Sequence, residues 1–234
     1  MSNVNSQMYV VSLGGSLIVP HSGIDWQYLK KFRATIVKQI KKGKKFIIVA
    51  GGGVTARQYA QAAQKVLAIK SEDRDWLGIH SSRLNAHLVR TIFYDWSHPE
   101  IIRHADKKIK FKEKIIVAGG WKPGWSTDYV AVRLADAYGV NKVINLSNID
   151  YVYTKDPKKF KDAKKIEKIN WPDFRKIVGD KWTPGMSKPF DPIASKLAEK
   201  LKLKVVIMNG KKLGNLDNLF KNNKCNGTVI SSTY

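Results

Sequence analysis

The chain has 234 residues, 43% hydrophobic and 10% aromatic, which is enough for one large domain or two small ones with a buried core. No apolar run approaches the roughly 20 residues of a membrane-spanning helix, and the first residues lack the basic and apolar regions of a secretion signal. The single cysteine, Cys225, excludes an internal disulfide and fits a reducing cytoplasm.

The formal net charge of +23 favours anionic partners. Lysines carry most of it and are spread over many segments, whereas arginine, which DNA-reading proteins use for bidentate base contacts, is sparse. No nucleic-acid-binding motif accompanies the lysines. We therefore expect a solvated basic surface that attracts small anions such as nucleotides, and no dedicated nucleic-acid site.

Short apolar segments alternate with segments of helical periodicity along the chain. Strands are expected over residues 8–13, 45–50, 115–120, 142–147 and 204–209. Helices are expected over 25–42, from about 54, from near 75 to past 90, and over 127–138, 171–178, 192–202 and 213–221. The alternation predicts an α/β fold, a three-layer α/β/α sandwich with a largely parallel central sheet. A change of composition near residue 142 predicts one domain, 1–234, with an N-terminal lobe of about 1–141 and a C-terminal lobe of about 142–234.

Three of the expected strands run into paired or triple glycines, at residues 14–15, 51–53 and 119–120. Parallel sheets bind ligands at the carboxyl ends of their strands, and glycine lets backbone amides approach a phosphate closely. The first of these junctions, VSLGGSL, contains no lysine, and the chain has no P-loop pattern. A phosphate cradle there would need its positive charge from elsewhere in the chain.

The segment GGGVTA, residues 51–56, matches the spacing of a dinucleotide-binding fingerprint. In that fold the acidic residue about 20 positions later ends a strand, whereas Asp75 here precedes a helical stretch. An anion site at the start of the following helix, with Arg57 one turn in, is the favoured interpretation. A tight turn that requires glycine only for its conformation is the alternative.

Three further segments could line a ligand site. The loop 119–128, GGWKPGWSTD, offers aromatic faces, and its Ser126 and Thr127 could donate to a phosphate or cap the next helix. The segment 147–157, SNIDYVYTKDP, could equally be a polar turn, and Asp191 could be a helix cap before Pro192. No cysteine cluster, H-E-x-x-H pattern or histidine spacing predicts a metal held by side chains alone.

Taken together and in this order, these segments resemble the amino acid kinase superfamily and, within it, the archaeal-type uridylate (UMP) kinases. The resemblance covers nearly the whole chain, and it is carried by Gly14-Gly15-Ser16, GGG-x-x-A-R at 51–57, D-W-L-G-I-x-x-S-R-L-N-A at 75–86, GG-x-x-PG-x-ST at 119–127, N-x-D-x-V-Y-x-x-DP at 148–157 and DP-x-A-x-K at 191–196. It implies phosphoryl transfer from ATP to UMP with magnesium, in a cytoplasmic homohexamer built from dimers.

The resemblance also implies roles for individual residues. Gly15 and Ser16 would line the ATP phosphates, and Gly53 and Arg57 would lie between the phosphates of the two nucleotides. The acceptor UMP would be bound by Gly52, by Asp75 through its ribose hydroxyls, and by the loop residues Trp121, Lys122, Pro123, Gly124, Trp125, Ser126 and Thr127. The adenosine side would be formed by Ser147, Asn148, Tyr153 and Asp156. The catalytic residues near the transferred phosphoryl group would be Arg57, Asp128 and Asp191.

Two positions depart from the family pattern. Many relatives carry a lysine at the position of Ser12, so we expect its charge to come from magnesium and Arg57, with Lys122 and Lys188 as further candidates. Many also have glycine where this chain has Tyr151, which could alter the adenosine-side turn or stack on adenine. Two alternatives stay open: another kinase of the superfamily that acts on a small acid or isoprenoid phosphate, and a nucleotide-binding protein without catalysis.

Overall fold

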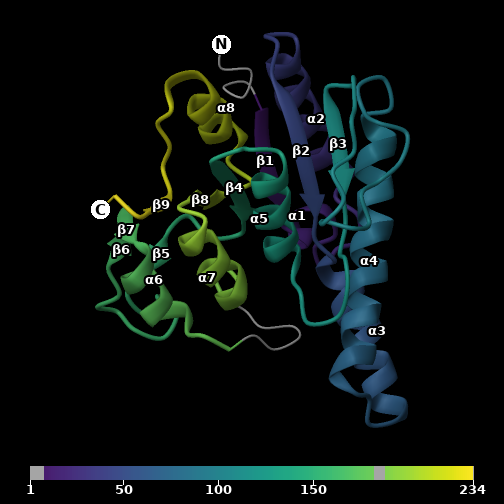
Figure 1. The fold of residues 1–234 in the computed structure, drawn as a ribbon. Helices are drawn as coiled ribbons and strands as arrows, with labels where there is room; N and C mark the ends of the chain where they lie inside the picture. The colour runs from purple at the N-terminus through teal and green to yellow at the C-terminus, as the bar shows by residue number, and fades with distance from the viewer. Residues whose placement is uncertain (1–7, 182–187, 234) are drawn as a thin grey trace.

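The computed structural model describes residues 8–181 and 188–233. Within these residues a seven-stranded sheet has the order β3-β2-β1-β4-β8-β9-β7 (Figure 1). Its strands are β1 (Met8–Leu13), β2 (Lys45–Ala50), β3 (Ile115–Ala118), β4 (Lys142–Ser147), β7 (Lys168–Asn170), β8 (Lys204–Asn209) and β9 (Thr228–Ser231). Every neighbouring pair is parallel except β8 with β9, which confirms the largely parallel sheet.

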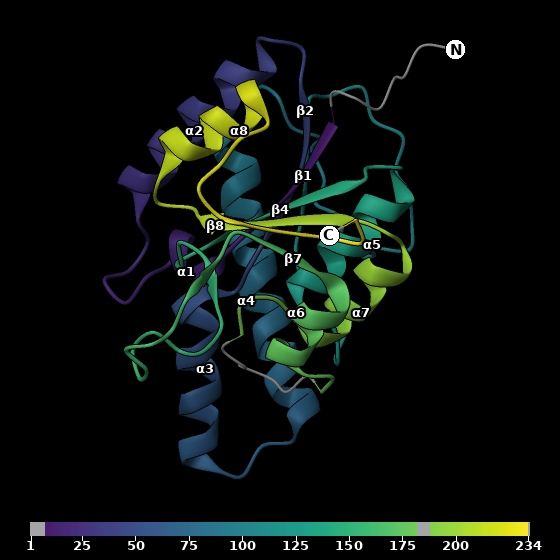
Figure 2. The same cartoon turned by 90° about the vertical axis from the view of Figure 1, so that its left-hand side faces the viewer.

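Helices cover both faces of this sheet (Figures 1 and 2). The helices of one face are α1 (Gly15–Ile18), α2 (Trp26–Ile40), α4 (Ser71–Ile92) and α8 (Leu213–Asn222). Those of the other face are α5 (Thr127–Ala137), α6 (Trp171–Val178) and α7 (Pro192–Lys200). Alternation along β1 sends Val10 into the core under α5 and Val11 into the core under α2, so the expected three-layer sandwich is confirmed. Helix α3 (Gly53–Val66) packs on α4, and this pair extends beyond the sheet (Figure 1).

Most differences from the sequence expectations concern short elements. Helix α4 begins at Ser71, four residues before the expected start near Asp75, and β3 ends at Ala118. The elements that were not expected are α1, β7, β9 and the two-stranded antiparallel ribbon of β5 (Val152–Tyr153) and β6 (Lys165–Ile166). Each of these elements has at most four residues, which is too short for a hydrophobic period to be recognised.

The glycines after β1 and β2 pack directly against each other. Leu13 and Ala50, the last residues of the paired strands, are register partners, and the Gly51 N–H donates to the Leu13 carbonyl at 3.0 Å. A Cβ on Gly15 would lie 2.6 Å from the carbonyl carbon of Gly51, and Gly53 has a φ of +69° in the left-handed region. Only glycine fits at this contact, which we call the glycine seam (residues 14–15 and 51–53).

We expect Gly15→Ala to destabilise the fold by about 3 kcal/mol or more, because the new Cβ overlaps backbone atoms that cannot rotate away. Gly214→Ala in α8 is the matched control, since a Cβ there meets nothing within 4 Å. It should leave stability unchanged or raise it by about 0.5 kcal/mol. Urea unfolding of both variants measures the difference, and a Gly15→Ala variant as stable as the control would contradict the tight contact.

Candidate active site

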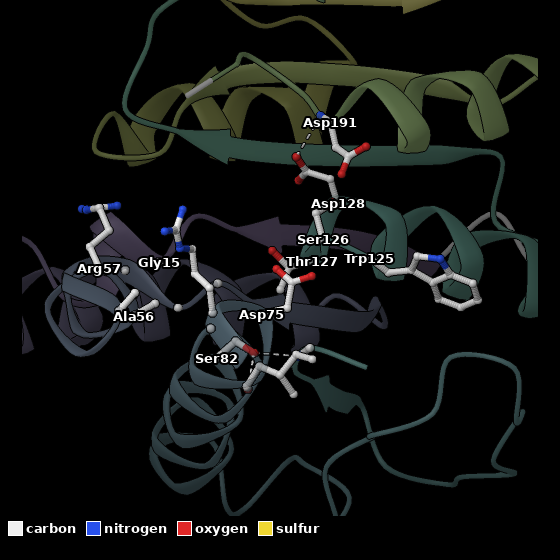
Figure 3. A pocket seen from close by; sticks show the side chains of 18 of the residues that line it. Gly15, Ala56, Arg57, Asp75, Ser82, Trp125, Ser126, Thr127, Asp128 and Asp191 are labelled. Atoms are coloured by element: carbon white, nitrogen blue, oxygen red, sulfur yellow. Dashed lines mark hydrogen bonds between the residues drawn. The ribbon is translucent and has the colours of Figure 1, made fainter. Parts of the chain in front are cut away.

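A cleft of about 380 Å³ opens at the carboxyl ends of the central strands (Figure 3). The sequence-predicted site residues that line it are Gly15, Gly52, Gly53, Arg57, Asp75, Trp125, Ser126, Thr127, Asp128 and Asp191. They come from the glycine seam, from α3 and α4, from the loop before α5 and from the start of α7. The structure thus brings together residues that lie far apart in the chain.

Of the residues that the structure describes, three with basic side chains line this cleft: Arg57, Arg74 and Lys188. Arg74, one residue before Asp75, was not singled out by the sequence; its Nη2 also donates to Gln64 Oε1 on α3 at 3.1 Å. Lys122, by contrast, does not line the cleft, because its ammonium lies 4.0 Å from the ring centre of Trp125 and 5.2 Å from that of Trp121. The cations nearest a bound anion are therefore Arg57, Arg74 and Lys188.

Helix α4 fixes the loop that follows β3. Asp75 Oδ2 accepts from the Gly124 N–H at 2.7 Å, and Arg83 donates to the carbonyls of Gly120 and Trp121 at 3.0 and 2.9 Å. The Ser82 hydroxyl accepts from the Gly120 N–H at 2.7 Å. These bonds hold the loop over the cleft at several points along its length.

The same helix also holds the glycine seam. Asn85 Nδ2 donates to the carbonyls of Gly51 and Gly52 at 2.8 and 3.2 Å. Ser82, Arg83 and Asn85 lie in the segment 75–86 that resembles the family, but the resemblance implies no role for these three side chains. Their side chains bind backbone carbonyls and amides, and a sequence pattern does not record such contacts.

Aromatic rings pack against one another in the loop 119–128 and at the start of α5. Trp121 and Trp125 meet edge to face with ring centres 4.4 Å apart, and Trp125 lies 4.5 Å from Tyr129 of α5. Trp121 is buried, and Trp125 lines the cleft. Ser126 caps α5 by accepting from the Tyr129 N–H at 3.2 Å, so the capping interpretation of that serine is confirmed.

Two carboxylates from different helices meet at the cleft, as Figure 3 shows. Asp128, in the first turn of α5, accepts at Oδ1 from the Ser12 hydroxyl at 3.0 Å and from Asn145 Nδ2 at 2.8 Å. Ser12 and Asn145 are register partners on β1 and β4 and point to the same face of the sheet. A polar residue inside the apolar run of β4 was the available signal for Asn145.

Asp191 caps α7, as one sequence interpretation expected. Its Oδ1 accepts from the N–H groups of Ile193 and Ala194 at 2.5 and 2.8 Å, and its own N–H donates to Asp128 Oδ2 at 3.4 Å. Its Oδ2 is buried without a hydrogen-bond partner of ordinary geometry, although the Ser126 hydroxyl is close enough to lower the pKa. The cap therefore leaves one carboxylate oxygen free.

Burial raises the pKa of both carboxyl groups. For Asp128 burial has the largest effect and the charge of Asp191 adds to it, so its pKa rises to about 7 despite the hydrogen bonds from Ser12 and Asn145. Burial also raises the pKa of Asp191 and, at the cleft wall, that of Asp75. Burial and the closeness of the two carboxyl groups make a negative charge on this pair unfavourable.

The other predicted residues lie outside the cleft lining. Ser16 belongs to α1, and Pro123 and Gly124 belong to the loop beside the cleft. Ser147 ends β4, where its carbonyl accepts from the Gly210 N–H at 2.8 Å, and its hydroxyl is 3.5 Å from Asn148 Oδ1. Tyr153 pairs with β6, and Asp156 accepts from the Lys158 N–H at 2.9 Å. Among the described residues, no helix is long and apolar enough to cross a membrane, and no cluster of three or more His, Cys, Asp or Glu could hold a metal ion.

The amino acid kinase family model matches residues 7–209. Together with the parallel sheet and the cleft at its carboxyl edge, this match shows that the chain belongs to the amino acid kinase family. Within this family, its relatives include archaeal uridylate kinases. That of Sulfurisphaera tokodaii is 36% identical over 188 residues, 79% of this chain and 83% of the relative. That of Pyrococcus abyssi is 36% identical over 207 residues, 87% and 90% of the two chains.

A solved structure shows the same fold. The crystal structure of uridylate kinase from Archaeoglobus fulgidus is similar with a TM-score of 0.79 and 27% identity, covering 96% of this chain and all of that chain (100%). UMP kinase from Bacillus anthracis, at 20% identity and a TM-score of 0.76, shares the fold over 97% of both chains. The likeness therefore spans both the described sheet and the helices that form the cleft.

The buried carboxyl pair predicts a specific dependence of stability on pH. The pKa of Asp128 is about 7 in the folded protein and about 3.9 when unfolded, so its contribution is complete below about pH 4 and is lost as pH rises through about 7. Asp128→Asn keeps the shape and removes the charge. At about pH 8 the variant should be more stable than the parent by at least about 1 kcal/mol, with a smaller difference at about pH 5.

Asp217→Asn is the control, because its expected effect on stability is opposite in sign to that of Asp128→Asn. Hydrogen bonds from Lys221 and Lys38 hold the pKa of Asp217 at about 2, so this substitution should destabilise the protein at both pH values. Thermal unfolding in EDTA and low salt measures both effects. An Asp128→Asn variant that is less stable than the parent at alkaline pH would show that the carboxylate is stabilised as an anion.

Proposed function

We propose that the chain is a uridylate kinase, which transfers the γ-phosphoryl group of ATP to UMP to give ADP and UDP by direct in-line transfer with magnesium. The observation that carries this proposal is the joint position of Asp75, the loop 119–126 and the glycine seam around one basic cleft. The archaeal relatives are named uridylate kinases, and the chain aligns with most of their length.

The reaction requires that the two nucleotides be positioned and their charge neutralised, more than that a proton be transferred. The phosphate oxygen of UMP is already a nucleophile at neutral pH, so no general base is needed. Gly15, Gly53 and Arg57 line the cleft, and we propose that the two backbone amides and the guanidinium contact the phosphates of both nucleotides. They would bring the two polyanions into line and stabilise the charge on the transferred group.

Asp75 is proposed to accept hydrogen bonds from the UMP ribose. Its Oδ2 is engaged by Gly124, which leaves Oδ1 for a hydroxyl group. Gly52 and the loop residues 121–127 would enclose the base and the phosphate. In this arrangement, the Asp75 carboxylate would both hold the loop 119–128 and select the sugar of the acceptor.

The ATP side is proposed to run from Gly15, Ser16 and Gly53 to Ser147, Asn148, Tyr153 and Asp156. The segment that begins at Gly15 and the segment that begins at Ser147 are neighbours in the structure. The residues just before them are hydrogen-bonded, because the Gly14 N–H donates to the Leu146 carbonyl at 2.9 Å. The first lobe, about 1–141, would then bind UMP, and the second, about 142–234, would bind adenosine. Both substrates would be soluble nucleotides, drawn in by the basic surface.

Magnesium fits the carboxylate end of the cleft. It is usually held by one or two carboxylates together with substrate phosphates, and Asp191 has a buried Oδ2 without a hydrogen-bond partner beside Asp128. These two residues would hold the ion or its waters. When bound with ATP, magnesium neutralises charge on the phosphate oxygens.

The long helix pair suggests assembly. Three large apolar side chains of α3 and the residue after it are exposed: Tyr59, Val66 and Leu67, of which Val66 is 81% accessible. Exposed apolar surface of this kind is typical of subunit contacts. We propose that this end of the molecule contributes to a cytoplasmic homo-oligomer, which the resemblance makes a homohexamer of dimers.

An ADP-release assay with a panel of acceptors tests the proposed reaction. Turnover should be highest with UMP and lower with dUMP and CMP, and absent with glutamate, carbamate and isopentenyl phosphate. Asp75→Asn keeps an acceptor for Gly124 and removes the charge, so it should raise KM for UMP by about tenfold and leave KM for ATP nearly unchanged.

The same variant should also lose the preference for UMP over dUMP, because the ribose contact is what it removes. Asp73→Asn, two residues earlier on the exposed side of α4, is the matched control and should behave as the parent. Equal loss of affinity for UMP and ATP would contradict the assignment of Asp75. Turnover of another acceptor without any turnover of UMP would contradict the reaction itself.

The positions of the three predicted cations give a second test. Arg57→Ala should lower kcat by about 100-fold, and Lys188→Ala by about tenfold, because both side chains line the cleft. Lys122→Ala should change kcat by no more than about twofold, since its ammonium stacks on two tryptophans. Steady-state kinetics at saturating magnesium distinguishes them, and a loss at Lys122 as large as that at Arg57 would refute the assignment.

A further inference from the structure

A second cleft lies on the C-terminal half of the molecule and shares no lining residue with the first. It has a volume of about 740 Å³ and lies between helix α8 with the loop after it and strands β4, β8 and β9. Lys142 begins β4, whereas Ser147 ends that strand at the proposed ATP side. Ser147 is five positions further along the strand than Lys142, or about 17 Å away, so the second cleft is distinct from the nucleotide cleft.

The cleft gathers more lysines than carboxylates, since its lining holds Lys142, Lys168, Lys204 and Lys224 against Glu167. Lys142 and Lys204 are the first residues of neighbouring parallel strands and are register partners, so two like charges face each other. Burial, and then the charge of Lys204, lower the pKa of Lys142. Among the described residues neither lysine forms an ion pair, and Lys142 Nζ donates to the neutral Asn223 Oδ1 at 2.5 Å. Like charges opposite each other destabilise a sheet, and a bound anion would remove that cost.

The rest of the lining suits a phosphorylated ligand. Glu167, the cleft's carboxylate, is paired with Lys165 at 2.7 Å, and Lys224 adds a further cation. The side-chain amides that line the cleft, each able to donate and accept, belong to Asn215, Asn218, Asn222, Asn223 and Asn226. Tyr151, the residue that replaces the family's glycine, also lines this cleft and contributes an aromatic ring.

The loop at the cleft's edge is fixed in place. Asn215 Nδ2 donates to the Asn226 carbonyl at 2.6 Å, and the Asn226 N–H donates back to Asn215 Oδ1 at 2.8 Å. Asn223 ends α8 in the left-handed conformation, with a φ of 57°, where its side chain meets Lys142. Asn215, Asn223 and Asn226 are therefore held in place by hydrogen bonds within the protein, which lowers the entropic cost of binding a ligand beside them.

We propose that this cleft is a binding site for a small phosphorylated anion of nucleotide size, held by Lys142, Lys204 and Lys224 at its phosphates and by the asparagine amides and Tyr151 at its remainder. A small ligand is favoured over a nucleic acid because the lysines converge within one concavity. A nucleic-acid surface would need a basic stripe that follows a phosphate backbone. The site is independent of the proposed kinase reaction.

Cys225 provides a reporter inside this cleft. It is the only cysteine of the chain, it lines the cleft and is half-buried, and it lies away from the kinase residues. A ligand seated on the lysines should slow its alkylation by iodoacetamide, whether or not the nucleotide cleft is filled. The rate of alkylation against concentration of inorganic tripolyphosphate, ATP or UTP gives a dissociation constant for this site alone.

We expect at least one of these probes to protect Cys225 at physiological ionic strength. Protection by tripolyphosphate as strong as that by the nucleotides would mean that phosphate contacts dominate, and protection by nucleotides alone would mean that the base is also bound. Lys142→Met and Lys204→Met should each weaken protection by about tenfold. Lys31→Met, on the exposed face of α2, is the matched control and should leave protection unchanged.

Thermal unfolding provides the check on folding. Lys142→Met should melt no lower than the parent at low salt, because it removes one of two facing like charges. No protection by any of the three probes would overturn the proposal, as would equal protection in the parent and both cleft variants. Protection by a short single-stranded RNA but by none of the small anions would also overturn it, in favour of a nucleic-acid surface.

Discussion

The close approach of Gly15 to Gly51 and Gly53 is the constraint on which the rest of the site depends. A side chain at either position would push the ends of β1 and β2 apart, since its Cβ would overlap backbone atoms of the other turn. With hydrogen in place of Cβ, the two backbone turns meet, and Gly15, Gly51, Gly52 and Gly53 line one cleft. In the proposed function, phosphates would bind main-chain groups at this seam, and the absence of a lysine at Ser12 would matter less than in an open site.

Helix α4 links this seam to the opposite wall. Asn85 holds the carbonyls of Gly51 and Gly52, while Ser82, Arg83 and Asp75 hold the loop after β3. One helix thus positions both sides of the cleft, and in the proposed function it would keep two bound nucleotides at a fixed distance. At the other end of the cleft, burial raises the pKa of Asp128 and Asp191, so a negative charge on either is unfavourable there.

The sequence predicted what depends on periodicity and glycine. The parallel sheet followed from apolar strands such as residues 45–50, and the cleft from strands that end in glycine. Asp191 was recognised as a possible helix cap and accepts the expected hydrogen bonds at the start of α7. The two-residue strands β5 and β6 were missed, because their pairing is set by tertiary contacts with no local signal. The stacking of Lys122 on tryptophan and the place of Arg74 in the cleft depend on where side chains point, which no spacing rule specifies.

In the proposed function, one cleft binds UMP between the glycine seam and the loop held by Asp75. A crystal structure of the protein with UMP and a non-hydrolysable ATP analogue would show where UMP binds. We expect density for UMP between residues 52–57 and 121–127, with the ribose hydroxyls on Asp75 and the phosphate near Arg57. UMP bound elsewhere, or a ribose turned away from Asp75, would contradict it.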